Sequence, residues 1–234
     1  MRRCAIGWSL PGGGCALLLL ALAASCASEP PPPHQAALRE AEAELAMGNA
    51  ASALTGFLRA HELAPDHPAA LGGLALAELQ LGRPAAALGW FDQLERIRAD
   101  AFDAELTAAR CDALLAAVTA ELDREAWAAA IELAERTPSA VVCRAEPLST
   151  LAIRAHVAGA AQAREANQIA AAIDHLAWVL AEQPGHADAT LAVVDLLLRE
   201  GAQDEALRLL SEALAHHPND ERLIEATVDL LAEP

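Results

Sequence analysis

The chain has 234 residues and a formal net charge of −17 at pH 7, and aromatic residues make up only 3% of it, with no tyrosine. A composition rich in alanine and leucine is typical of closely packed helices and does not favour a strand-rich fold. The charge becomes about −19 once Arg2 and Arg3 leave with a signal segment, and this acidic excess argues against binding to the phosphate backbone of a nucleic acid.

Residues 1–25 have the layout of a secretory signal. Arg2 and Arg3 give it a short basic start, an apolar run extends from Ala16 to Ala24, and Ser25 follows. The run is too short to span a bilayer, which needs about 20 apolar residues. We therefore expect this segment to be removed during export.

The sequence LAASC, which ends at Cys26, resembles the lipobox of bacterial lipoproteins. In that family a small residue, here Ser25, precedes a cysteine that is lipidated and becomes the new N-terminus. This chain departs from the pattern at Ala23, where leucine is preferred. The resemblance implies a lipid anchor on Cys26, and Ala27 after it implies the outer membrane. The alternative is ordinary signal cleavage near Ala24 to Ala27, with Cys26 incidental.

Residues 26–33 form a short segment that ends in four prolines, Pro30 to Pro33. Consecutive prolines favour the polyproline II conformation, which rises about 3 Å per residue. The segment is therefore predicted to be an extended spacer between the lipidated cysteine and a folded body.

A pattern with a period of 34 residues runs through the rest of the chain. It consists of a glycine, an alanine five residues later, a large apolar residue four residues after that, and a proline eight residues further on. These positions recur as Gly48, Ala53 and Phe57, as Gly82, Ala87 and Phe91, as Ala172 and Pro184, and as Gly201, Ala206, Leu210 and Pro218.

This pattern resembles that of the tetratricopeptide repeat (TPR) family, in which the glycine ends a first helix, the alanine lies where two helices cross and the proline closes the second helix. The resemblance implies an all-α solenoid of about five helix-turn-helix repeats with a C-terminal capping helix, built from residues 34–234. An unrelated α-solenoid is the alternative. The expected repeats are 34–67, 68–101, 111–144, 153–186 and 187–220, and the expected capping helix is 221–232.

Two segments exceed the period. Nine extra residues, Phe102 to Arg110, contain strong helix formers and no helix breaker. We expect them to extend the first helix of the third repeat at its N-terminus, with Asp100 or Asp103 as its cap. Eight extra residues lie near Pro138 and Pro147, and these prolines predict a longer loop.

The sequence contains no set of residues that predicts catalysis or a cofactor. It has no glycine-rich phosphate loop and no nucleophile motif, and none of its eight histidines has the spacing of a metal site. Most histidines fall at turns between repeats, whereas His156 and His175 are expected nearer the interior of the fourth repeat, where a structural role is commoner than a catalytic one. We therefore expect no enzymatic activity, no cofactor and no metal.

The TPR resemblance also implies that the first helices of successive repeats line a concave groove. We expect it to be mainly apolar, with arginines toward the fourth and fifth repeats, and to bind an apolar or amphipathic segment of a protein partner whose acidic end lies at these arginines. The alternative is that tightly packed repeats leave no open groove. The positions carried over by register are Leu38, Leu45, Leu76, Leu79, Leu115, Leu122, Leu198, Arg154, Arg164 and Arg199.

Cys111 and Cys143 are the cysteines that remain in the processed chain besides Cys26. Antiparallel helices place the start of the first and the end of the second at the same edge of the third repeat, and an exported protein meets an oxidising compartment. A disulfide between them is one prediction. Two free thiols are the other, because the loop near Pro138 could carry Cys143 beyond the Cα separation that a disulfide spans.

These features together predict a non-enzymatic, lipid-anchored TPR scaffold of the bacterial cell envelope, at the outer membrane and facing the periplasm. The lipoproteins that it resembles serve the assembly of envelope machines, so we expect a protein partner and no nucleic acid. The alternative is a soluble periplasmic carrier or holdase that binds lipid or unfolded chains in an apolar groove.

Overall fold

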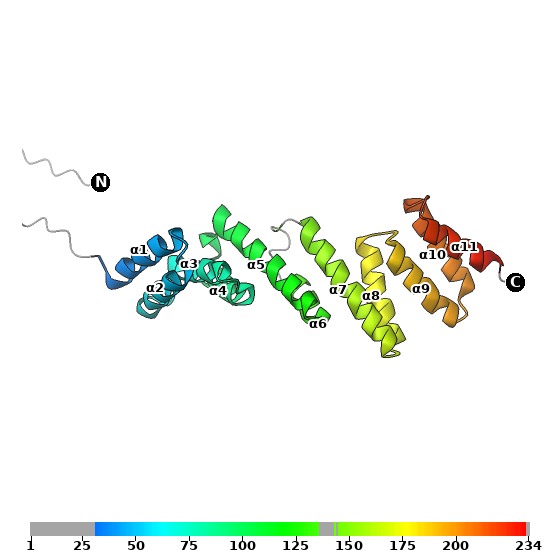
Figure 1. Ribbon diagram of the computed structural model, residues 1–234, viewed down its shortest axis with the longest axis horizontal. Helices are drawn as coiled ribbons and strands as arrows, with labels where there is room; N and C mark the ends of the chain where they lie inside the picture. The colour runs from blue at the N-terminus through cyan, green and yellow to red at the C-terminus, as the bar shows by residue number, and fades with distance from the viewer. Residues whose placement is uncertain (1–30, 136–142, 144, 233–234) are drawn as a thin grey trace, which may run out of the picture.

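The computed structural model of the protein describes residues 31–135, 143 and 145–232 (Figure 1). Within these residues the chain forms eleven α-helices, one short 3-10 helix and no strand, which confirms the predicted all-α fold. The predicted signal segment, Cys26 and Pro30 lie outside the described residues. None of the helices in the described part of the chain is long and apolar enough to cross a membrane.

The helices follow one another along an elongated array, in which ten of them form five consecutive pairs and the last covers the C-terminal end (Figure 1). Each helix contacts the next one along the chain. Their bounds are α1 Pro33–Ala46, α2 Ala50–Leu63, α3 Pro68–Gln80, α4 Pro84–Arg98, η2 Ala99–Ala101, α5 Ala104–Asp123, α6 Trp127–Glu135, α7 Ala145–Glu165, α8 Ile169–Glu182, α9 Ala187–Arg199, α10 Gln203–His216 and α11 Glu221–Ala232.

The same turn joins the two helices of every pair, and it needs one residue with a left-handed backbone. Gly48 has a φ of 81°, and the amide that follows it donates to the carbonyl of Glu44 over 2.9 Å, as at a helix end of the Schellman type. Glu125 and Asn167 take the glycine position in the third and fourth pairs, with φ values of 59° and 57°. The turn therefore forms without glycine, at the cost of an unfavourable backbone conformation.

We expect Glu125→Gly to raise the free energy of unfolding by about 0.5 to 1 kcal/mol, because glycine removes the steric penalty of the left-handed conformation at a smaller cost in chain entropy. Urea unfolding followed by circular dichroism measures the change. Glu125→Ala is the matched control, since it removes the carboxylate but keeps the Cβ atom. Equal stability of the glycine and alanine variants would contradict the explanation.

Small residues at the helix crossings bring the two helices of each pair close together. Ala53, Ala87 and Ala206 are completely buried, and the large apolar residue four positions after each is buried as well. Close approach between neighbouring pairs is most marked at Gly73 of α3, where a Cβ atom would lie 2.3 Å from the ring of Phe57 on α2. The 34-residue pattern is therefore a packing pattern, in which alanine and glycine make room for a large side chain, although the third pair has Ala134 in that position.

The nine extra residues after the second repeat lengthen α5, largely as expected. The helix begins at Ala104, and the Asp103 carboxylate caps it by accepting a hydrogen bond of 2.9 Å from the amide of Leu106. Phe102 lies before the helix. Asp100 belongs to the short helix η2 and forms an ion pair with Arg98 instead.

The prediction of a longer loop up to Pro147 is wrong. Helix α7 begins at Ala145, eight residues before Ile153, and Pro147 lies in its first turn. Proline is tolerated there because the first amides of a helix have no carbonyl partner within it. Helix α7 has 21 residues, compared with 14 in α1, so much of the excess is helix. Pro138 lies outside the described residues.

Candidate functional site

The first helices of the repeats form one layer along the array. Helix α1 contacts α3, α3 contacts α5 and α5 contacts α7, although these helices are not consecutive in the chain. These are the helices that were predicted from the sequence to line a groove. Two pockets open on this layer, one at α1, α3 and α5 and the other at α5 and α7.

The first pocket, which we call the leucine pocket, has a volume of 330 Å³. Leu45 of α1 and Leu76 and Leu79 of α3 supply its apolar wall, so three of the predicted groove residues do come together. Leu71 and Leu74, on the same helix α3, are completely buried. One side of α3 thus packs into the core, and Leu76 and Leu79 beside it are only partly buried. Leu79 both contacts the edge of the core and lines the pocket. The remaining lining residues are Glu42, Ala46, Gln80 and Glu105.

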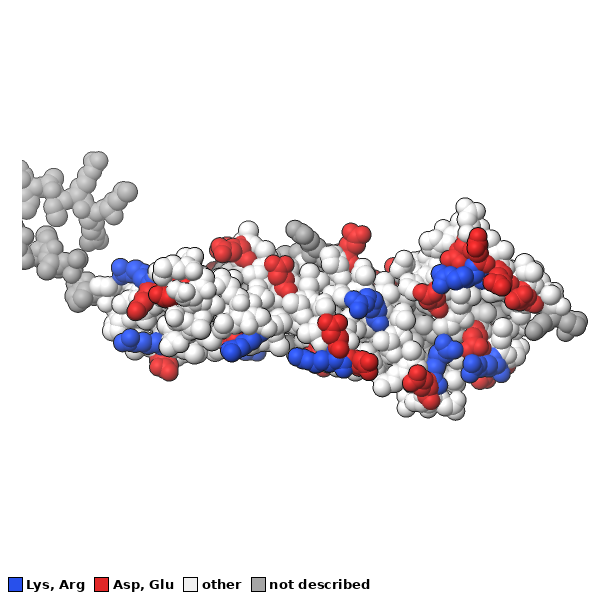
Figure 2. Space-filling view, in the orientation of Figure 1, with Lys and Arg blue, Asp and Glu red and all other residues white. Residues whose placement is uncertain are grey.

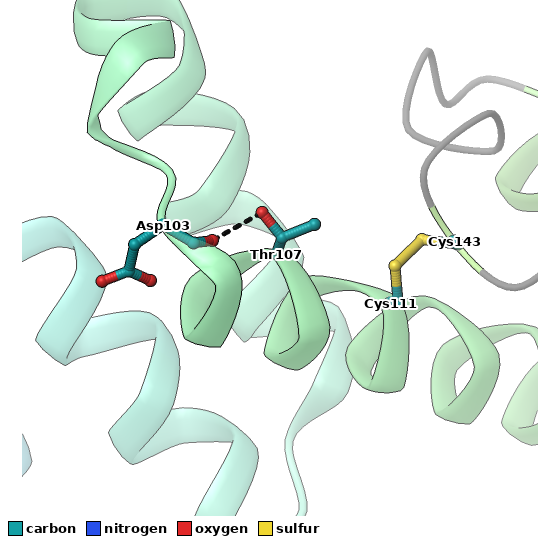
Figure 3. Close-up of a disulfide and its surroundings, with 4 residues drawn as sticks. All are labelled: Asp103, Thr107, Cys111 and Cys143. Carbon is teal, nitrogen blue, oxygen red and sulfur yellow. Dashed lines mark hydrogen bonds between the residues drawn. A yellow bond between two sulfur atoms is a disulfide. The ribbon is translucent and has the colours of Figure 1, made fainter.

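The second pocket, which we call the α5 pocket, has a volume of 580 Å³. Asp103, Thr107 and Cys111 follow one another along one side of α5, as their spacing of four residues requires (Figure 3). The Thr107 hydroxyl donates to the backbone carbonyl of Asp103 over 2.7 Å, so its hydrogen bond is made to the backbone at the start of the same helix. The other lining residues are Phe102, Ala104, Ala108, Asp112, Leu115 and, from α7, Pro147.

A disulfide joins Cys111 to Cys143, with their Cα atoms 5.1 Å apart (Figure 3). Cys111 lies on α5, and Cys143 precedes α7 by two residues. The bridge therefore fixes α5 to the start of α7, the two helices that flank the α5 pocket. Of the two alternatives that the sequence left open, the structure contains the bridge.

Leu115, a further predicted groove residue, lines the α5 pocket, and the remaining predicted groove leucines lie elsewhere. Leu38 is only 5% exposed and packs with Ala53 and Phe57 of α2, so it belongs to the core and a partner could not reach it. Leu122 is partly buried against the core of the third pair. Leu198, near the end of α9, is 39% exposed and lines neither of these pockets.

The arginines expected to attract an acidic partner are largely engaged within the protein. Arg164 of α7 lies 2.8 Å from the Asp195 carboxylate, and Arg199 lies 3.0 Å from the same group. Asp195 on α9 thus offsets part of both positive charges. Arg154 is exposed on α7. The C-terminal repeats therefore lack the concentrated positive charge that the sequence suggested.

His156 and His175 lie in the interior, as expected, and join three helices. His156 on α7 is buried, with its Nδ1 3.1 Å from Nδ1 of His175 on α8 and its Nε2 3.3 Å from a carboxylate oxygen of Glu135 on α6. Its ring stacks on Trp178, with centroids 4.0 Å apart. Burial lowers the pKa of His156, and the hydrogen bond to Glu135 opposes that shift. This arrangement is a packing contact between repeats.

Among the described residues, no group of three histidine, cysteine, aspartate or glutamate side chains could hold a metal ion. Sequence reasoning missed the carboxylates at the pockets, among them Glu42, because the predicted groove residues were leucines and arginines only. The position of Glu42 three residues before Leu45 placed both on one side of α1 and was the available signal.

The paired helices, their repeated turns and the layer of first helices define a helical-repeat solenoid. Sequence models of the tetratricopeptide repeat match residues 38–104 and 163–227, together more than half of the chain. The chain belongs to the TPR family, as the 34-residue pattern predicted. No protein of curated function matches it.

Several solved TPR structures resemble the chain at low sequence identity. The TPR protein TTC0263 of Thermus thermophilus is 22% identical, with 85% of this chain and 98% of that chain covered and a TM-score of 0.35. MamA from Desulfovibrio magneticus RS-1 is 14% identical, with coverages of 80% and 97% and a TM-score of 0.36. PilF of Pseudomonas aeruginosa is 14% identical, with coverages of 85% and 87% and a TM-score of 0.34. Likeness at this level gives no information about a partner.

Proposed function

We propose that this protein is a non-enzymatic adaptor of a bacterial cell envelope, anchored to the outer membrane through a lipid on Cys26, that holds a segment of a protein partner against its first helices. The TPR fold is a scaffold for protein–protein interaction, and the anchor and the groove are what the proposal adds. The observation that carries it is the leucine pocket, in which Leu45, Leu76 and Leu79 surround an open volume of 330 Å³.

The leucine pocket is informative because three leucines from two helices, each only partly buried, meet around one open volume. Single apolar side chains such as Leu63 and Leu231 are more exposed, but neither lines this pocket. Leu71, Leu74 and Phe57 nearby are almost completely enclosed. Leucines grouped at an open surface expose apolar area to water, and binding a partner would remove that area from water. This favours a docking surface over the alternative of repeats too tightly packed to leave a groove.

Support for the anchor comes from the sequence before the solenoid. A cysteine with two or three acyl chains gives stable membrane attachment, whereas one chain is marginal. Pro32 has an extended backbone, with φ of −50° and ψ of 144°, and α1 begins at Pro33. The seven residues from Cys26 to Pro32 would hold the solenoid up to about 20 Å from the lipid if the whole spacer is extended.

Crosslinking in intact envelopes tests both parts of the proposal. We expect the wild-type protein in the membrane fraction with a defined crosslinked partner, and Cys26→Ser in the soluble fraction. Leu79→Glu should stay at the membrane and keep its melting temperature but lose the partner, because the charge is hydrated in the open pocket and disfavours an apolar ligand. Leu63→Glu, at a 51% exposed position on α2, is the matched control and should keep the partner.

Three outcomes would overturn the proposal. If mass spectrometry finds an unmodified N-terminus at Ala27 or later, the protein has no lipid anchor on Cys26. The soluble carrier or holdase would then be the remaining function. Retention of both the partner and the melting temperature by Leu79→Glu would remove the groove as the binding surface. Unfolding of the same variant would show that Leu79 is a core residue and not part of an open groove.

A further inference from the structure

Negative charge surrounds both apolar pockets on the first helices. Among the described residues, the leucine pocket is lined by Glu42 and Glu105 and the α5 pocket by Asp103 and Asp112, and no arginine lines either. Asp103 caps helix α5. Within the described part of the chain, Glu42, Glu105 and Asp112 form no ion pair, so their charges are available to a ligand.

On the C-terminal helices, by contrast, several arginines sit beside acids. Arg222 bridges Asp188 and Asp220, and Arg208 lies near Glu205 and Glu212. On the face that Figure 2 shows, red and blue side chains adjoin over α8 to α11. Among the described residues, other carboxylates of this acidic chain, such as Glu62 and Glu182, also form no ion pair with an arginine, but those of the two pockets lie next to apolar side chains.

We infer that the partner segment is basic as well as apolar: leucine- or phenylalanine-like side chains enter the leucine pocket and the α5 pocket, and arginine or lysine side chains beside them reach Glu42, Glu105 and Asp112. The inference rests on the proposed function and names the chemistry of its partner. It reverses the charge expected from the sequence, because Asp195 holds two of the three arginines on which that expectation depended. The acidic excess of the whole chain adds a long-range attraction for a basic segment.

A selection from a random peptide display library tests this inference without knowledge of the natural partner. The target is the purified processed chain. We expect the enriched peptides to combine leucine or phenylalanine with arginine or lysine, and to bind more weakly as salt concentration rises. Enriched peptides that are acidic or show no charge bias, or a selection that enriches nothing, would overturn the inference.

Two variant pairs locate the binding and separate the two proposals. For a selected peptide, Glu42→Gln with Glu105→Gln should weaken binding about 2- to 10-fold and reduce its salt dependence, since exposed charge pairs contribute modestly. Glu62→Gln with Glu182→Gln changes the net charge equally on second helices and should leave binding unchanged. Binding that survives Leu79→Glu would refute the groove itself. Binding that needs Leu79 but ignores Glu42 and Glu105 would refute only the basic partner.

Discussion

Changing Asp92 to asparagine together with Glu95 to glutamine is expected to lower the free energy of unfolding by about 3 to 5 kcal/mol, because it leaves a buried guanidinium without a counter-ion. Arg110 of α5 is only 5% exposed, and its Nη2 lies 3.2 Å from Asp92 and 2.9 Å from Glu95 on α4. Its Nε has no hydrogen-bond partner among the residues that the structure describes, and the guanidinium lies 5.3 Å from the centre of the Phe102 ring. The two carboxylates are near the surface, so Arg110 is the group that depends on them.

Arg110→Met is the control for this prediction. It removes the buried charge, keeps apolar volume in place and leaves two carboxylates that water can reach, so it should cost less, about 1 to 2 kcal/mol. Adding Arg110→Met to the double variant should therefore restore stability. Urea unfolding of the three variants provides the comparison. If the double variant is no less stable than Arg110→Met, the buried arginine does not depend on its acidic partners.

The same ion pair predicts part of the acid sensitivity of the fold. The hydrogen bond from Arg110 lowers the pKa of Glu95 below its ordinary value of 4.5. A carboxyl whose pKa is lower in the folded state stabilises the fold above the ordinary value, and this contribution is lost as pH falls through the lower folded value. Wild type should lose stability in that range more steeply than the variant with Glu95→Gln.

Removal of the disulfide is expected to lower the free energy of unfolding by about 3 to 4 kcal/mol, because the bridge closes a loop with a sequence separation of 32 residues and so restricts the unfolded chain. Cys111→Ala with Cys143→Ala makes this change without placing a hydroxyl at Cys143, which is buried. Urea unfolding in a Cys26→Ser background measures it, since these are then the remaining cysteines of the processed chain.

Reduction of the unaltered bridge is the matched control for the alanine variant. A reductant should lower the melting temperature of the protein with both cysteines and leave that of the alanine variant unchanged. Alkylation of the unreduced protein reports the state of the thiols directly. Two labelled cysteines in protein isolated under oxidising conditions would show that the bridge does not form.

The sequence predicted the fold well because its strongest signals are local packing requirements. Ala53 and Phe57 recur with Ala87 and Phe91 because each pair of helices needs the same small and large residue at its crossing. Glu125 escaped notice because a glutamate carries no sign of a left-handed backbone. Pro147 was interpreted as a loop signal because proline suits both a loop and the first turn of a helix.

The candidate site was only partly predictable because it depends on how helices from different repeats meet. Leu38 and Leu45 are seven residues apart on α1 and share a side of it, but the core formed with α2 and α3 encloses Leu38 and leaves Leu45 partly exposed at the pocket. Asp195 lies 31 residues from Arg164, and no sequence pattern indicates that the two side chains meet. Helix periodicity thus identified the leucine pocket, whereas the charge around it required the structure.

The disulfide also determines how the protein would respond to a pulling force. An adaptor fixed to a membrane at one end and to a partner further along transmits tension through its backbone. With Cys111 and Cys143 joined, the tension passes through the sulfur atoms and bypasses α6 and the C-terminal part of α5. The bridge thereby withholds about 110 Å of extensible chain, at roughly 3.3 to 3.6 Å per residue. The oxidised protein would act as a shorter and stiffer tether than its reduced form.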